Sequence, residues 1–190
     1  MVTPIFDITE KGRVSSARAP RAEGECLRYR LDVVADSAVD VVQSAGGWLY
    51  DRAMAGWEVT VLLADSCDTR PLRILGVRAL DLEAQFALMG SASHNLAVSA
   101  KAFTADARVR EKVLESLDDP LTEVALWGDG WPLRVDRAMT RAQHVLSAAA
   151  RTFKGYALAA AGTPCESVDP TETLLCDASS PVDSELIRLG

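Results

Sequence analysis

Aspartates follow several of the segments whose residue patterns predict β-strands. Asp36 follows the first such segment, Asp65 the second and Asp129 the last. If these strands are parallel, their carboxyl ends meet at one edge of the sheet, where open α/β sheets bind ligands. Carboxylate oxygens are ligands of Mg²⁺, so Asp65 and Asp129 are candidate metal ligands. Aspartate is also common in helix caps and turns, which is the purely structural alternative.

The stretch "VALWGDGWPLRVDRAM" carries a second candidate site. A predicted strand ends in Gly128-Asp129-Gly130 and a predicted helix follows, which is where dinucleotide-binding folds place their phosphate-binding turn. Gly128, Asp129 and Gly130 are therefore candidate cofactor-binding residues. The match is partial, because Leu133 stands at the third glycine position. The alternative is an ordinary turn with Pro132 at the start of the helix.

Two tryptophans flank this turn. Trp127 precedes it and Trp131 ends it. Tryptophan buries a large area at low entropic cost and is enriched at the centres of protein interfaces, so Trp127 and Trp131 are candidates for contacting a protein partner. The alternative is that both belong to the core.

The sequence contains no complete catalytic motif of the common hydrolase, metalloprotease or nucleotide-binding kinds. His94 and His144 lie in segments with helical patterns, and nothing in their sequence neighbourhoods marks either as a general base. The four cysteines form no C-x-x-C pair, which argues against a zinc knuckle or a thioredoxin-type site.

Hydrophobic periodicity predicts an α/β protein: a single layered domain with a mixed sheet of at least four strands, flanked by helices. The expected strands are 26–35, 57–64, 72–80 and 122–128, and the expected helices are 38–53, one or two within 82–103, 106–117 and 133–161. The short link between the second and third strands predicts an antiparallel hairpin, which is why the sheet is expected to be mixed.

The predicted helix 38–53 contains an unusual pair, Gly46-Gly47. Glycine inside a helix is unfavourable, so either the helix bends there or another element packs closely against the bare backbone. Close packing is the favoured interpretation.

Charge and composition divide the chain into three parts: a flexible N-terminal arm (1–25), the α/β domain (26–162) and an acidic, largely extended tail (163–190). The tail carries six acidic residues and one basic residue, whereas the domain is nearly neutral. Binding to a nucleic-acid backbone needs a cationic surface, so a nucleic-acid partner is not expected.

The N-terminus has no signal-peptide pattern and no stretch of 18 apolar residues occurs, which predicts a cytoplasmic protein without a membrane partner. The leading hypothesis is an accessory or regulatory protein that acts by binding another protein, possibly as a subunit of an assembly, with no cofactor. The alternative is a nucleotide- or Mg-dependent α/β enzyme with acids at the carboxyl ends of its strands. A DNA-associated regulator is the third hypothesis.

Overall fold

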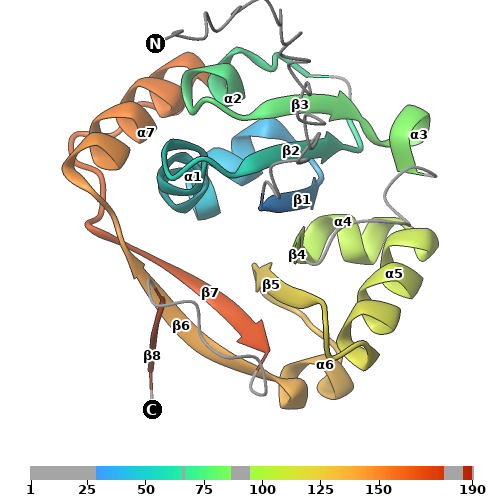
Figure 1. Ribbon diagram of the computed structural model, residues 1–190. Helices are drawn as coiled ribbons and strands as arrows, with labels where there is room; N and C mark the ends of the chain where they lie inside the picture. Colours follow the sequence, from blue (N-terminus) through green and yellow to red (C-terminus); the bar gives the residue numbers. More distant parts are fainter. Residues whose placement is uncertain (1–28, 66, 87–94, 178–185, 190) are drawn as a thin grey trace, which may run out of the picture.

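The computed structural model describes residues 29–65, 67–86, 95–177 and 186–189. Over these residues it shows one eight-stranded mixed sheet with helices on both faces (Figure 1), which confirms the predicted fold class. The strands are β1 (Arg30–Ala35), β2 (Glu58–Leu63), β3 (Arg78–Asp81), β4 (Asn95–Ser99), β5 (Glu123–Trp127), β6 (Met139–Val145), β7 (Thr171–Asp177) and β8 (Leu186–Arg188). The helices are α1 (Ala38–Met54), α2 (Arg70–Ile74), α3 (Leu82–Gln85), α4 (Ala100–Ala105), α5 (Ala107–Asp118), α6 (Leu133–Ala138) and α7 (Ala148–Ala160).

The strand order is β3-β2-β1-β4-β5-β7-β6-β8. β1 to β5 are mutually parallel, whereas β7 is antiparallel to both of its neighbours, β5 and β6. The sheet is therefore mixed as predicted, although the reversed strands are β7 and β8, which is antiparallel to β6, and not the one that the sequence indicated.

The predicted hairpin between the second and third strands is wrong. Residues 70–74 form the short helix α2, and β3 begins only at Arg78 and pairs in parallel with β2. Pro71 lies in the first turn of α2, where its missing N–H has no helical partner to lose. The helix provides the crossover that a parallel connection needs.

The single long helix predicted over 133–161 is also wrong. The segment divides into α6, β6 and α7. β6 pairs with β7 along its whole length, from Met139 opposite Asp177 to Val145 opposite Thr171. This pairing overrides the helical preference of an alanine-containing segment, because strand formation depends on the neighbouring strand more than on local sequence. The helices expected at 38–53 and 106–117 are confirmed as α1 and α5.

The chain beyond residue 162 contributes to the sheet. Residues 171–177 form β7, which lies between β5 and β6, and residues 186–188 form β8 beside β6. The sheet therefore includes residues beyond 162, where the sequence analysis placed the end of the α/β domain. The predicted arm 1–25 lies outside the described residues.

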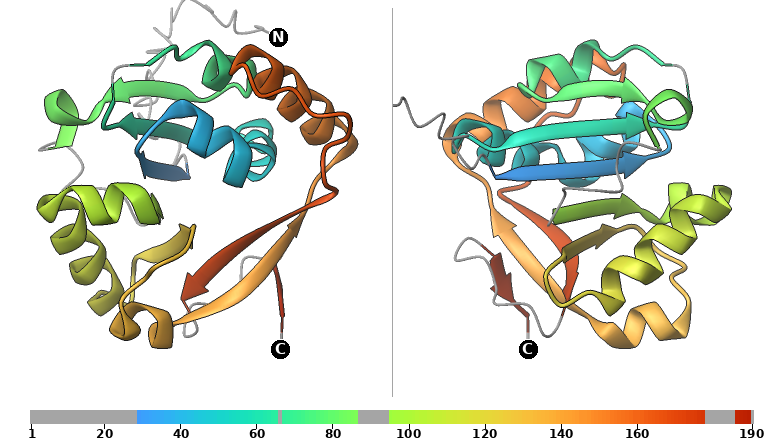
Figure 2. Two further views of the ribbon diagram at one scale, coloured as in Figure 1. Left: turned by 180° about the vertical axis from the view of Figure 1, so that it is seen from behind. Right: turned by 45° about the vertical axis from the view of Figure 1, so that its right-hand side comes forward.

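Helices cover both faces of the sheet. α1, α2 and α7 contact one another on one face, and α4 and α5 pack together on the other (Figures 1 and 2). Each face has its own apolar cluster, one including Val41, Leu49 and Leu72, and the other including Phe103, Val113 and Leu126. No described helix has the length and apolar character needed to cross a membrane.

The glycine pair of α1 marks a close approach between elements. A Cβ atom at Gly47 would overlap the side chain of Leu146, which confirms the prediction of close packing. The backbone N–H groups of Gly47 and Trp48 donate to the two carboxylate oxygens of Glu172, at 2.8 and 2.7 Å. Because Gly47 has no side chain, the backbone of α1 leaves space for the Leu146 side chain, which lies just before α7, and for the Glu172 carboxylate of β7.

Candidate functional site at the carboxyl ends of the strands

The centre of the sheet contains a topological switch point between β1 and β4. The chain leaves β1 into α1 on one face and leaves β4 into α4 on the opposite face. In open α/β sheets the crevice outside the strand ends at such a point is the usual ligand site. The carboxyl ends also lie level, because Val34 of β1 is opposite Val98 of β4, and Ser99 of β4 is opposite Trp127 of β5.

Asp40, Lys101 and Trp127 join three elements across this switch point. Asp40 lies in the first turn of α1 and is 8% exposed. Its Oδ1 is 3.4 Å from the Lys101 Nζ of α4, and its Oδ2 accepts a hydrogen bond of 3.2 Å from the Trp127 indole N–H. The side chain of Lys101 is 66% exposed. The result is an accessible ammonium group held by a buried carboxylate.

The turn after β5 contains two residues in the left-handed region of backbone conformation, and both are glycines. Gly128 and Gly130 have φ values of 87° and 90°, in the left-handed region. A Cβ on Gly128 would lie 3.0 Å from the Cβ of Ala100, so the turn also passes close to the start of α4. Asp129, between the glycines, is exposed.

A cavity of about 300 Å³, termed here the β5-end pocket, opens where β5 stops and β7 continues. Four elements contribute to its lining: the end of β5 with the turn that follows it, the part of β7 next to that turn, one residue of β6 and one residue of α1. The lining residues are Ser44, Leu126, Trp127, Gly128, Asp129, Arg141, Thr173, Leu174 and Leu175. Trp127 thus connects the pocket to the Asp40–Lys101 pair.

The structure separates the two predicted metal ligands. Asp36 and Asp65 end adjacent parallel strands, and the Asp65 N–H donates to the Asp36 carbonyl. Asp129, however, follows β5, and β1 and β4 lie between β2 and β5. Three strand spacings amount to about 14 Å. Two oxygens bound to one Mg²⁺ lie about 4 Å apart at most, so Asp65 and Asp129 do not converge on one ion.

The sequence predicted cofactor binding by the turn 128–130 and partner binding by two tryptophans, and the structure agrees better with the first prediction than with the second. Gly128 and Asp129 line a pocket, and their use in binding a cofactor stays a prediction. Trp127 is only 2% exposed, and Trp131 packs against Phe103 with ring centroids 4.9 Å apart. These two side chains therefore do not present the exposed aromatic pair that partner binding would need.

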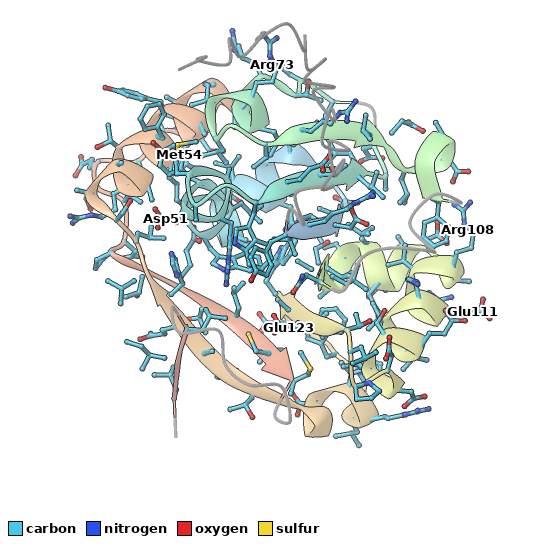
Figure 3. All side chains as sticks on the ribbon, in the orientation of Figure 1. Asp51, Met54, Arg73, Arg108, Glu111 and Glu123 are labelled. Carbon is cyan, nitrogen blue, oxygen red and sulfur yellow. The ribbon has the colours of Figure 1, made fainter. Side chains whose placement is uncertain are left out.

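A second cavity, of about 360 Å³, is lined by Asp51, His144, Val145 and Ser147. The side chain of Asp51, labelled in Figure 3, accepts from Ser147 Oγ at 2.6 Å and lies 2.9 Å from His144 Nε2. Ser147 thus donates to the aspartate and not to the histidine, so His144 does not activate it as a nucleophile. The Ser147 Oγ also accepts from the Ala150 N–H and caps α7, which indicates a structural role.

The solved structures that share this fold include three deacetylase structures. A deacetylase described in complex with teicoplanin, from the teicoplanin biosynthesis pathway, is 12% identical and has a TM-score of 0.51 over 85% of this chain and 99% of that one. The A40926 pseudoaglycone deacetylase Dbv21 is 13% identical, with a TM-score of 0.53 over 86% and 99%. The zinc-inhibited form of teicoplanin deacetylase Orf2 is 11% identical, with a TM-score of 0.54 over 81% and 100%. No protein-family model and no curated protein sequence matches the chain.

These comparisons correct two expectations from the sequence. The prediction of a protein-binding regulatory protein is contradicted, because the structures with this fold are described as enzymes. The alternative, an α/β enzyme, agrees better with them. The expectation of no cofactor is contradicted as well, because one of these enzymes is described in a zinc-inhibited form.

The described donors at the strand ends do not fit a zinc ion. Zinc takes four ligands, and protein sites supply at least three of them. In the part of the chain that the structure describes, no three His, Cys, Asp or Glu side chains come together in a suitable arrangement. Both carboxylate oxygens of Asp40 already have partners, and one of these is the cation of Lys101.

Two cationic residues of the site escaped the sequence analysis. Lys101 was expected in a broken helical segment, and Arg141 in the middle of a long helix. Lys101 follows β4, and Arg141 lies within β6 at the level of Leu126 of β5; neither β4 nor β6 was predicted. The apolar residues of "MTRAQHV" recur at three-residue spacing, which is typical of a helix and not of a strand, and "NLAVS" is too short to distinguish strand from helix.

Proposed function

We propose that the protein is an enzyme that hydrolyses the amide bond of a small N-acylated substrate, with the reaction at the mouth of the β5-end pocket. The observation that carries the proposal is the position of Asp129. Its exposed carboxylate lies at the strand end beside the switch point and lines the pocket. The fold shared with deacetylases supports the choice of reaction.

Asp129 has the chemistry of a general base. A carboxylate within reach of a bound water takes its proton as the oxygen attacks the acyl carbon. The same group then returns the proton to the leaving nitrogen, so that the C–N bond breaks and a carboxylic acid and an amine are released. The glycines on both sides of Asp129 leave space for the substrate to approach its carboxylate.

Lys101 supplies the positive charge that this step needs. As water attacks, the carbonyl oxygen becomes negative, and a fixed cation nearby stabilises it. Ser99 of β4 is directly opposite Trp127 of the adjacent strand β5. Lys101 follows Ser99 by two residues, and Asp129 follows Trp127 by two residues. Asp40 acts as a positioning residue, because its carboxylate holds the Lys101 ammonium at the crevice.

The test measures amine release from a panel of N-acetylated amino acids and amino sugars by the wild-type protein and by Asp129→Asn. We expect the substitution to lower kcat/KM by about 100-fold or more, because it removes a general base. The assay has three arms, namely protein as purified, protein with EDTA and protein with added zinc, since zinc inhibits a deacetylase of this fold.

The matched control is Asp118→Asn, which changes an exposed aspartate at the end of α5 that pairs with exposed Arg134. It should leave kcat/KM unchanged. No amine release from any compound in any arm would overturn the proposal, as would an Asp129→Asn protein that keeps full activity.

A further inference from the structure

The geometry points to a recognition site for a substrate carboxylate at Arg141, on the side of the β5-end pocket away from Asp129. This inference rests on the proposed function and specifies its substrate class: N-acylated acids, in which a carboxylate lies a few bonds from the amide to be cleaved. Arg141 would touch the substrate but take no part in bond cleavage.

Arg141 projects from β6 into the pocket lining and is exposed. Within the described ranges, no carboxylate forms an ion pair with it, whereas Arg30, Arg70, Arg108 and Arg134 all have acidic partners. A guanidinium presents several N–H donors in a plane, which match the two oxygens of a carboxylate. The pocket therefore contains a cation available to a ligand.

Two hydroxyl groups line the same cavity. Thr173 lies on β7 and shares a face with Arg141, because Leu175, two residues from Thr173, is directly opposite Arg141. Ser44 lies on α1, one turn after Asp40. Hydroxyls donate hydrogen bonds to carboxylate oxygens that a guanidinium leaves free. The three donors come from three different elements and surround one space.

The size and charge of the cavity select a small substrate of defined polarity. A volume of about 300 Å³ is at the lower end for small-molecule pockets. Asp129 at the β5 turn repels a second anionic group, so an acid can bind with its carboxylate toward Arg141 but not in the reverse direction. The amide then faces the strand ends.

The experiment measures binding and hydrolysis separately on the 190-residue chain. Calorimetry compares the 20 N-acetyl amino acids with their neutral methylamides, and inorganic phosphate is a further probe. We expect the acids to bind at least tenfold more tightly than their amides. Arg141→Gln should remove this difference and Arg141→Lys should restore part of it, since lysine keeps the charge but not the planar donors. Arg73→Gln, at an exposed position of α2 (Figure 3), is the control and should bind as wild type.

Each result separates this inference from the proposed function. Acids that bind through Arg141 without amine release support the recognition site and contradict the proposed reaction. Amine release that is equal for acids and amides, and unchanged in Arg141→Gln, overturns the recognition site alone. Equal binding of acids and amides, or no binding by any acid, also overturns it. Tighter binding of phosphate than of every acid would contradict the assignment to carboxylates.

Discussion

Glu172 is a buried ionisable residue on the α1 side of the sheet, and three donors hold its carboxylate. It is 4% exposed, and its carboxylate meets the Lys154 ammonium at 2.5 Å as well as two backbone N–H groups of α1. Lys154 in turn donates to the Gln43 carbonyl at 2.8 Å. One buried ion pair thus connects β7, α7 and the middle of α1.

Removing Lys154 should be costly. Lys154→Met leaves the Glu172 carboxylate buried without its cation, and breaking one side of a buried pair typically costs about 3–5 kcal/mol. Urea unfolding at pH 7 measures the loss. In the double variant with Glu172→Gln most of the stability should return, because the uncompensated charge is gone. A double variant no more stable than Lys154→Met would contradict this account.

Stability should also depend on pH through Glu172. Burial raises the pKa of this carboxyl above its ordinary value of 4.5, against the opposing effects of Lys154 and the backbone donors. Above pH 4.5 the unfolded chain releases this proton while the folded protein retains it, so the contribution of Glu172 to stability declines as pH rises through the raised pKa. The difference in free energy of unfolding between wild type and Glu172→Gln, followed from pH 4 upward, should therefore decrease.

Two helical glycines provide a matched comparison of packing. Gly47→Ala places a methyl group inside the side chain of Leu146, whereas Gly155→Ala meets only Val168 at 3.6 Å. Overpacking costs about 1–3 kcal/mol, but alanine at an uncrowded helical position stabilises by about 0.5–1 kcal/mol. Thermal unfolding should therefore give opposite shifts in Tm. Leu146→Ala in the Gly47→Ala background tests whether that overlap is the cause.

At the scale of elements, the start of α7 depends on one residue. Ser147 caps the helix through Ala150 and also donates to Asp51 at the end of α1. Ser147→Ala should lower stability by about 1–2 kcal/mol, because it removes the cap and leaves Asp51 with one donor fewer. Chemical denaturation measures this loss. Ser147→Asn, which retains a capping side chain, should lose much less.

The sequence predicted elements that depend on local pattern and missed those that depend on partners. α1 has an N-cap at Ser37, a long apolar face and Gly56 just after its end, so its bounds follow from the residues themselves. β6 exists because β7 pairs with it, and β7 comes 26 residues or more later in the chain. No local pattern in "MTRAQHV" carries that information, which is why a helix was expected there.

The residues of the candidate site also fall into two groups, those that local sequence pattern predicted and those that depend on the pairing of strands. Asp129 was predicted because it follows a recognisable strand, and the structure places it at a pocket. Arg141 comes from β6 and Thr173 from β7, and only the tertiary arrangement brings them to Asp129. The prediction that paired Asp65 with Asp129 required the strand order, which puts two strands between theirs.

For the whole molecule, we expect the chain to need residues up to 177 for folding. A chain that ends at Gly162, the domain boundary expected from the sequence, lacks β7 and therefore leaves β5 and β6 without their common neighbour. It also lacks Glu172, so that Lys154 is unpaired. Circular dichroism during heating should show no cooperative transition. A chain that ends at Asp177 loses only β8 from the described sheet and should unfold cooperatively. Cooperative unfolding of the 1–162 chain would contradict this expectation.

The position of β7 also sets the order of events during synthesis. β1 to β6 emerge from the ribosome first, yet the strand that completes the middle of the sheet is almost the last to appear. Until then β5 and β6 present open edges, which are the surfaces on which partly made chains aggregate. Thr173, Leu174 and Leu175 arrive with β7 as one wall of the β5-end pocket. A nascent chain therefore lacks this wall of the β5-end pocket until β7 has paired with β5 and β6, and any ligand of the pocket that binds during translation would report the moment of that pairing.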